Sequence, residues 1–316
     1  MLWLNLLFFL LSCIALVASG TFLVKSLTKI SRFLHLSEYV IAFILMAFAT
    51  SIPELFVGIS SALAKNTALS LGNVIGSNIA DIGLIAGIAI LVGRGIKIRS
   101  KKIKKDSLLV LLIAFLPIVL FLFGGVISRS DGAILLAAFF LYSWHLIRRR
   151  RKFKKTLENK VKRTEIVLHS ALFVIFLFIL FFSSKFVVKY ATQLAIELAL
   201  PPVIIGLFLI ALGTSLPELV FESRAVKMGH GEMALGDLFG SIVANSTLVL
   251  GITALIMPIT ANFVLSIVGS AFMLVFTFLF ATFINSGLKL DVMEGISLLL
   301  LYIIFVFIEM YIKGMI

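Results

Sequence analysis

One polar block occurs twice in this chain, at an offset of 164 residues. Residues 47–57 (AFATSIPELFV) match 211–221 (ALGTSLPELVF) at six of eleven positions, and 71–81 (LGNVIGSNIAD) match 235–245 (LGDLFGSIVAN) at five of eleven. Apolar helices resemble one another by chance through Leu and Val, but here Thr, Ser, Pro, Glu and Gly recur in one register. The chain is therefore predicted to consist of two copies of one ancestral half.

The two blocks lie among long apolar spans. The chain is 61% hydrophobic and 14% charged, whereas a soluble protein has about 25% charged residues. Stretches of about 20 apolar residues are long enough to cross a bilayer as helices, and they lack the alternation of membrane β-strands. We therefore expect an all-α polytopic membrane protein surrounded by a lipid bilayer. Its ten expected spans are about 3–24, 38–64, 68–93, 106–128, 131–147, 165–190, 202–226, 232–257, 260–284 and 293–313.

The net charge of +13 comes from bases in the short segments between spans. The loop after span 3 has seven bases and the loop after span 5 has ten, whereas the loops after spans 2, 4 and 8 have few. Basic loops of this kind face the cytoplasm. The pattern therefore predicts that both termini are outside, and it does not indicate a nucleic-acid partner.

Each half contains five spans, which is an odd number. The second half must then sit in the membrane upside down relative to the first, as an inverted-topology repeat of the kind found in many secondary transporters. The predicted units are a first repeat at 1–147 and a second at 165–316, joined by a basic cytoplasmic linker at 148–164. Their candidate ion-binding blocks are 47–81 and 211–245.

The first part of each block sets a carboxylate beside a proline. Thr50 and Glu54 are four residues apart and so share a helix face. Pro53 has no N–H, so the carbonyl of Ala49 loses its helical hydrogen-bond partner. The second block repeats this arrangement with Thr214, Pro217 and Glu218. Irregular backbone at membrane depth is tolerated where it lines a cavity inside the protein, so we expect a site at each break.

The second part of each block combines glycines with oxygen-bearing side chains. Pairs of glycines four residues apart allow close helix packing. Ser77 and Asp81 project from one helix face, as do Ser241 and Asn245. All candidate ligands are therefore oxygens, which suit Ca²⁺, Na⁺ or Mg²⁺. They are Glu54, Asp81, Glu218, Asn245, Thr50, Ser51, Thr214, Ser215, Ser77 and Ser241. Three clustered carboxylates cannot all stay ionised and unpaired, so they must bind cations or protons, as an antiporter requires.

The blocks GTSLPEL and GNVIGSNIAD resemble the α-repeats of the sodium/calcium exchanger family, within the cation/calcium antiporter superfamily. The resemblance extends over essentially the whole chain and is strongest to prokaryotic members without a large cytoplasmic domain. It implies a monomeric antiporter of a prokaryotic inner membrane that transports Ca²⁺ and Na⁺ without an organic cofactor. By this resemblance, Glu54 and Glu218 are the central ligands shared by both ions, flanked by Asp81 and Asn245.

The same resemblance assigns further roles. The hydroxyls of both blocks complete the sites, and the carbonyls of Ala47 and Ala211 are expected to contact Na⁺. Spans 1 and 6 are expected to be the sliding pair that alternates access. The chain departs from the family at Asp237, where Asn is expected, and Glu222 and Arg224 are unusual in span 7. Glu222 and Arg224 are interpreted either as a local pair near the cytoplasmic end or as part of an ion path.

Other functions remain possible at this point. A Ca²⁺/H⁺ exchanger would use Glu54 and Glu218 as proton carriers, although the many hydroxyls favour Na⁺. Acid rings also occur in ion channels, but inverted repeats with a central charge cluster favour alternating access. An intramembrane enzyme is disfavoured because no nucleophile or metal-ligand spacing supports it. The sequence has no nucleotide-binding loop, so we expect an ion gradient to supply the energy.

Overall fold

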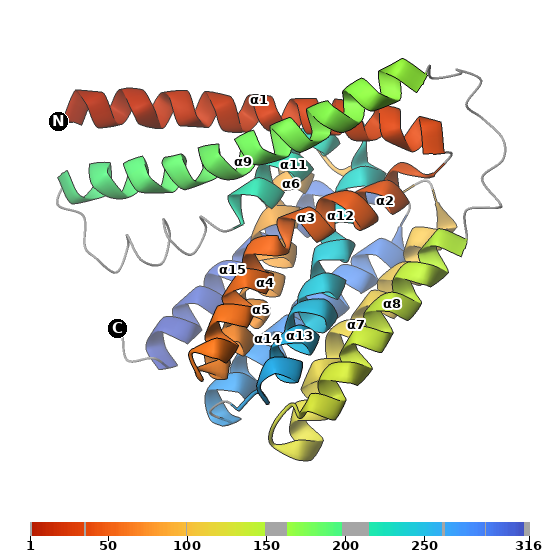
Figure 1. The fold of residues 1–316 in the computed structure, drawn as a ribbon, viewed down its shortest axis with the longest axis vertical. Coiled ribbons are helices and arrows are strands. Elements are labelled where there is room, and N and C mark those ends of the chain that lie inside the picture. Colours follow the sequence, from red (N-terminus) through yellow and green to blue (C-terminus); the bar gives the residue numbers. More distant parts are fainter. Residues whose placement is uncertain are drawn as a thin grey trace.

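The computed structural model describes residues 2–34, 36–98, 100–148, 163–197, 215–260, 263–287 and 289–312. These residues form helices joined by short turns, with two short strands (Figure 1). The first half contains α1 (Leu2–Leu34), α2 (Glu38–Ile41), η1 (Ala42–Ala47), α3 (Phe48–Thr50), α4 (Ile52–Leu63), α5 (Thr67–Ala80), η2 (Asp81–Ile85), α6 (Ala86–Val92), β1 (Ile96–Lys97), α7 (Lys101–Gly124) and α8 (Arg129–Arg148), where η denotes a π-helix.

The second half repeats this order in its described part. Its elements are α9 (Arg163–Glu197), α11 (Leu216–Lys227), α12 (Gly231–Val243), η5 (Ala244–Val249), α13 (Leu250–Ile256), α14 (Phe263–Ser286), β2 (Lys289–Leu290) and α15 (Val292–Ile312). Most of the predicted linker at 148–164 lies outside the described residues, so the predicted unit boundaries stay a prediction.

The expected spans agree with the helices. In the described part of the chain, eight helices are long and apolar enough to cross a membrane, and the bent pair Glu38–Thr50 and Ile52–Leu63 makes a ninth. They coincide with nine of the ten expected spans. The remaining expected span is the seventh, at 202–226. It begins outside the described residues and ends within α11. The prediction of an all-α polytopic membrane protein is confirmed.

The spans that carry the second part of each block form the centre of the protein. In the apolar stretch of Thr67–Val92, 78% of the residues are buried, and in that of Gly231–Ile256, 83% are buried. In α15 the buried share is only 11%. The outer helices expose apolar side chains because a bilayer solvates them. The polar residues of the blocks are therefore enclosed by protein.

Helix contacts come in reciprocal pairs between the two halves. α4 packs against α13, and the equivalent α11 packs against α6. In the same way α8 contacts α13 while α15 contacts α6, and α7 contacts η5 while α14 contacts η2. Such exchange of partners is what an approximate two-fold axis between the halves produces.

The first helices of the two halves run antiparallel. Phe22 of α1 stacks on Phe176 of α9 with ring centroids 4.3 Å apart, and Phe8 stacks on Tyr190 at 5.2 Å. The later residue of α1 thus contacts the earlier residue of α9, which is the pattern of antiparallel helices. Figure 1 shows the pair lying side by side across the remaining helices. Equivalent helices of opposite direction are what an inverted-topology repeat requires.

The turns that follow odd-numbered spans meet at one end of the molecule. β1 pairs antiparallel with β2, with Ile96 opposite Leu290. His230, in the turn between α11 and α12, places Nδ1 2.9 Å from the Glu38 carboxylate. We call this end, which also carries the loop 94–105, the basic end.

The turns that follow even-numbered spans meet at the opposite end. Ile127 and Ile259 form an antiparallel bridge, and the Thr67 hydroxyl donates to the Pro258 carbonyl at 3.2 Å. The two sets of turns thus lie at separate ends, in agreement with the alternation of loops that the basic segments predict.

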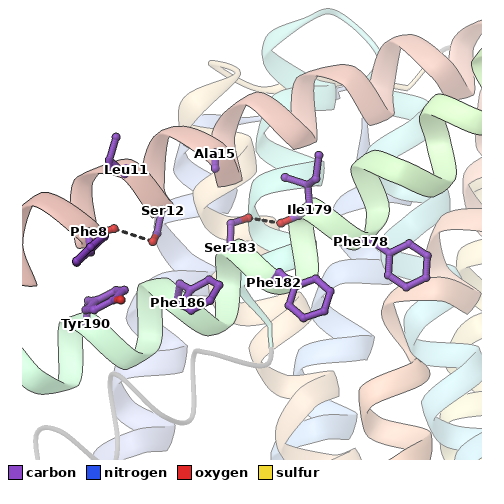
Figure 2. Close-up of a pocket in the computed structure, with 10 residues that line it drawn as sticks. All are labelled: Phe8, Leu11, Ser12, Ala15, Phe178, Ile179, Phe182, Ser183, Phe186 and Tyr190. Atoms are coloured by element: carbon purple, nitrogen blue, oxygen red, sulfur yellow. Dashed lines mark hydrogen bonds between the residues drawn. The ribbon is translucent and has the colours of Figure 1, made fainter.

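A groove of about 470 Å³ lies between α1 and α9 (Figure 2). Its lining residues are Phe8, Leu11, Ser12, Ala15, Phe178, Ile179, Phe182, Ser183, Phe186 and Tyr190. Both serine hydroxyls donate to carbonyls of their own helices, Ser12 to Phe8 and Ser183 to Ile179. The groove therefore presents an apolar surface, and none of the candidate ion ligands lines it.

The glycines of the second block bring helices into backbone contact. A Cβ on Gly236 would lie 2.2 Å from the Tyr39 carbonyl oxygen, and one on Gly240 would lie 2.3 Å from Cβ of Ala47. The close packing predicted from the glycine spacing is confirmed here. The equivalent glycines of the first block are Gly72 and Gly76. By the repeat they would meet residues 203 and 211, which lie outside the described residues.

Gly236→Ala is expected to destabilise the folded protein by about 1–3 kcal/mol, because an added methyl group would force α12 away from α2. The measurement is thermal unfolding of the purified protein in detergent. Gly124→Ala is the matched control, since no described atom lies within 4 Å of a Cβ added at that glycine. Equal unfolding temperatures for the two variants would contradict the need for this close approach.

Candidate functional site

Glu54 and Glu218 occupy equivalent helix starts. Each lies in the first turn of its helix, α4 or α11, directly after a proline. Proline is tolerated there because the first helical N–H groups have no intrahelical partner. The positive end of the helix dipole also favours a carboxylate at this position. Both side chains are only 3% exposed.

The break expected near Pro53 is present. The helix that ends at Thr50 and the helix that begins at Ile52 are inclined by 42° to each other. Ser51 is the hinge residue between them. The equivalent residue of the second half, Ser215, directly precedes α11. The residues before Ser215, including Thr214 and Ala211, lie outside the described residues, so a break there stays a prediction.

Asp81 and Asn245 lie in π-helical segments. Asp81 begins η2, and Asn245 is the second residue of η5, at the equivalent place in the other half. A π-helical turn is wider than an α-helical one and is frequent at functional sites. Both side chains are buried. The sequence predicted these residues as ligands but did not predict the π-helical backbone.

The fold brings the three predicted carboxylates together. The Ser77 side chain is hydrogen-bonded to Glu54. Asp81 interacts electrostatically with Glu54, and Glu218 interacts with both. The charges thus come from α4, η2 and α11 and face a common region. Buried around them are the remaining described candidates, Thr50, Ser51, Ser77, Ser215, Ser241 and Asn245.

Several oxygens of this region lack a hydrogen-bond partner among the described residues. They are Ser51 Oγ, Glu54 Oε2, Glu218 Oε2, Ser241 Oγ and Asn245 Oδ1. Buried polar atoms are normally paired, because an unpaired one has lost water without compensation. Unpaired oxygens from both halves fit ligands for a hard cation.

The arrangement differs from a closed metal site. Within the described ranges, no three acidic, histidine or cysteine side chains converge closely enough to hold one metal ion. A cation here would therefore be held by one or two carboxylates together with hydroxyl, amide and carbonyl oxygens, a mixed set that Ca²⁺ accepts.

The Ala47 carbonyl is already engaged within its helix. It accepts the Ser51 N–H at 3.0 Å and the Thr50 hydroxyl at 3.3 Å. A carbonyl oxygen has two lone pairs, so contact with an ion would require the Thr50 hydroxyl to turn away. The expected role of this carbonyl stays a prediction.

Asn78 orients Asn245 across the boundary between the halves. Asn245 donates its amide N–H to Asn78 Oδ1 at 3.3 Å, and Asn78 donates to Ser246 Oγ at 2.9 Å. Because the amide nitrogen of Asn245 is bound in this way, its unpaired oxygen is left for a cation. Sequence reasoning did not place Asn78 and Ser246 in the site. The available signal was their departure from the repeat, since their equivalents are Ile242 and Ile82.

Two further acids lie beside the predicted cluster. Asp237 and Glu222 are 0% and 2% exposed, and both interact electrostatically with Asp81. Arg224 instead donates its Nε–H to the Thr21 hydroxyl of α1 at 2.9 Å. The expected local pairing of Glu222 with Arg224 is not among the ion pairs of the described residues.

Comparisons with known proteins identify the family. The model of the sodium/calcium exchanger protein family matches residues 4–148 and 168–311. The chain is 29% identical to the sodium/calcium exchanger MaX1 of Methanosarcina acetivorans, over 99% of this chain and 100% of MaX1. It is 31% identical to the uncharacterized membrane protein MJ0091 of Methanocaldococcus jannaschii, over 94% of this chain and 95% of that protein.

Solved structures agree with this assignment. The sodium-calcium exchanger NCX_Mj soaked with Na⁺ and Sr²⁺ superposes with a TM-score of 0.81 at 30% identity, over 96% of this chain and 98% of that structure. The resemblance of the two repeated blocks is thereby confirmed across nearly the whole length. The chain belongs to the sodium/calcium exchanger protein family.

Proposed function

We propose that this protein is a secondary antiporter that exchanges Ca²⁺ for Na⁺ across a prokaryotic inner membrane by alternating access. The observation that carries the proposal is the burial of Glu54 and Glu218 at equivalent helix starts, beside Asp81 and among unpaired oxygens of both halves. Family membership and the names of MaX1 and NCX_Mj support the choice of ions.

The charge of the cluster explains why transport is coupled. Carboxylates in a low-dielectric interior are costly unless a cation compensates them. Either Ca²⁺ or Na⁺ satisfies the same oxygens, but they compete because they use the same carboxylates. A loaded cluster is neutralised and can change its access, whereas an empty cluster keeps an uncompensated charge. Exchange is therefore favoured over one-way leakage.

The helix pair α1 and α9 is the moving part in this proposal. α1 meets α11, which carries Glu218, at a tight contact: a Cβ on Gly20 would lie 2.7 Å from Val220 Cγ1. The Arg224–Thr21 hydrogen bond lies beside it. Movement of α1 along α11 would therefore change the surroundings of the ion cluster. We place the basic end in the cytoplasm, with both termini outside, and the monomer as the transporting unit.

The experiment that tests this function is uptake of radioactive Ca²⁺ into proteoliposomes that contain the purified protein. Uptake driven by internal Na⁺ and unaffected by a pH gradient at clamped voltage is the expected result. Uptake driven only by a proton gradient would replace Na⁺ with H⁺ as the coupling ion. Uptake that needs only a Ca²⁺ gradient would indicate a channel.

Glu54→Gln and Glu218→Gln are each expected to reduce Na⁺-driven Ca²⁺ uptake to the background of empty liposomes, because each removes one central negative charge. Glu294→Gln is the control. Glu294 lies at the start of α15, where it accepts the Asp291 N–H, and a glutamine can keep that bond. Normal flux in either central variant would exclude the proposed site.

Asp81→Asn is expected to change the Na⁺ dependence of uptake more than the unfolding temperature, because the amide keeps the shape and removes the charge. The approximate two-fold axis offers a sharper test. Asp81→Asn combined with Asn245→Asp returns one acid to the equivalent place in the other half, so the double variant is expected to recover part of the Na⁺ dependence. An unchanged Na⁺ dependence in the single variant would argue against Asp81 as a ligand.

Asn78→Leu is expected to weaken Ca²⁺ binding about 10- to 100-fold, the usual cost of losing a residue that orients a metal ligand. Calorimetric titration of the detergent-solubilised protein measures this affinity. Ser70→Ala is the control, since Ser70 lies on the same helix and forms a buried hydrogen bond with Thr253 of the other half at 3.1 Å. Similar affinities for the two variants would show that Asn78 does not orient the site.

A further inference from the structure

The described interior contains more carboxylates than the proposed central site uses. Glu222 and Asp237 join Glu54, Asp81 and Glu218, and all five side chains are at most 3% exposed. Ion pairs among the described residues join Lys29 to Glu165, His230 to Glu38 and Lys289 to Asp291. None of them reaches the buried acids. The two additional acids therefore need either a bound cation or a proton to compensate their charge.

Asp237 is the less satisfied of the two additional acids. It is fully buried, and neither of its carboxylate oxygens has a hydrogen-bond partner among the described residues. Its charge interacts with Glu222, Glu218 and Asp81. The charges that interact with Asp237 are thus themselves negative, and a bound cation stabilises such an arrangement.

The equivalent place in the first half is filled differently. Glu222 corresponds to Gly58, where a Cβ would lie 2.5 Å from Thr253 Oγ1 and 3.2 Å from Ser70 Oγ. Ser70 and Thr253 satisfy each other by a hydrogen bond. The space beside Gly58 is therefore occupied by the hydrogen-bonded hydroxyls of Ser70 and Thr253.

The second half has alanines and carboxylates where the first half has hydroxyls. The residues equivalent to Ser70 and Thr253 are Ala234 and Ala89, both buried. Asp237 likewise corresponds to Asn73. Small side chains thus replace the hydroxyl pair, and two carboxylates replace a glycine and an amide. The difference between the halves is a coordinated exchange of residues and not a single substitution.

These acids lie on the basic-end side of the central cluster. Glu222 is one helical turn after Glu218 in the direction of the α11–α12 turn, and Asp237 is one turn before Ser241. At that turn, a Cβ on Gly231 would lie 2.7 Å from Ile96 Cγ2 of β1. Any ion that passes between the central cluster and the basic end through the second half would meet this pair.

We infer that Asp237 and Glu222 bind a second hard cation beside the central cluster, on its basic-end side, and that the first half has no equivalent of this site. The inference rests on the proposed function only for the choice of Ca²⁺ and Na⁺ as probes. The carboxylate oxygens suit both ions. The site would hold an ion next to the central one during its passage to or from the basic end.

The test is equilibrium binding of radioactive Ca²⁺ and Na⁺ to the purified full chain in detergent. In the Glu54→Gln/Glu218→Gln background, cation binding is expected to persist for at least one of the two ions. Adding Asp237→Asn or Glu222→Gln to that background is expected to lower this remaining affinity at least about tenfold, as loss of a ligand does. Asp237→Asn keeps the size and shape of the side chain and removes its charge.

Ser70→Ala in the same background is the matched control and is expected to leave the remaining binding unchanged. Thermal unfolding of each variant separates loss of the site from loss of the fold. Equal binding of both ions with and without Asp237 and Glu222 would overturn the inference. Failure of the proposed function would appear separately, as normal transport by the Glu54→Gln/Glu218→Gln variant.

Discussion

The structure depends on the cost of keeping carboxylates inside an apolar protein that is itself inside a membrane. Five acids are buried at the centre, and helices that are apolar on their outer surfaces surround them. Such charges are stable only with a compensating cation or proton. The starts of α4 and α11, the π-helical segments and the unpaired oxygens all lie where these charges meet. The fold thus holds buried carboxylates that are destabilising until a cation or a proton compensates their charge.

The approximate two-fold relation determines how the helices are arranged. The residues that differ between equivalent positions determine which side chains surround the central site. Helix contacts are exchanged reciprocally between the halves, so the two glutamates face the centre from opposite directions. The residues around them break the symmetry: Asp81 corresponds to Asn245, Asn78 to Ile242, and Glu222 to Gly58. These departures gather near the centre, where identical residues would place like groups against each other across the axis.

Much of this architecture was predictable, because membrane helices and gene duplication leave signals along the chain. The length of the apolar runs located nine spans. The offset of the repeated blocks predicted the duplication, and the odd number of spans in each repeat predicted its inversion. Pro53 predicted the helix break. The Asn78–Asn245 bond was not predictable from spacing, since it joins residues of different halves and depends on how the central helices cross. The same holds for Arg224, whose partner Thr21 belongs to α1 and which sequence proximity had paired with Glu222.

The Asn78–Asn245 bond also bears on the history of the duplication. A dimer of two first halves would set two copies of Asp81 and Asn78 face to face, and a dimer of two second halves would gather six acids from Glu218, Glu222 and Asp237. Neither assembly reproduces the centre of the present chain, in which an amide from one copy orients an amide from the other. Once the copies divided these residues between them, each became an obligate complement of the other. Fusion into one polypeptide then guarantees that the two unlike copies are made in equal number and meet.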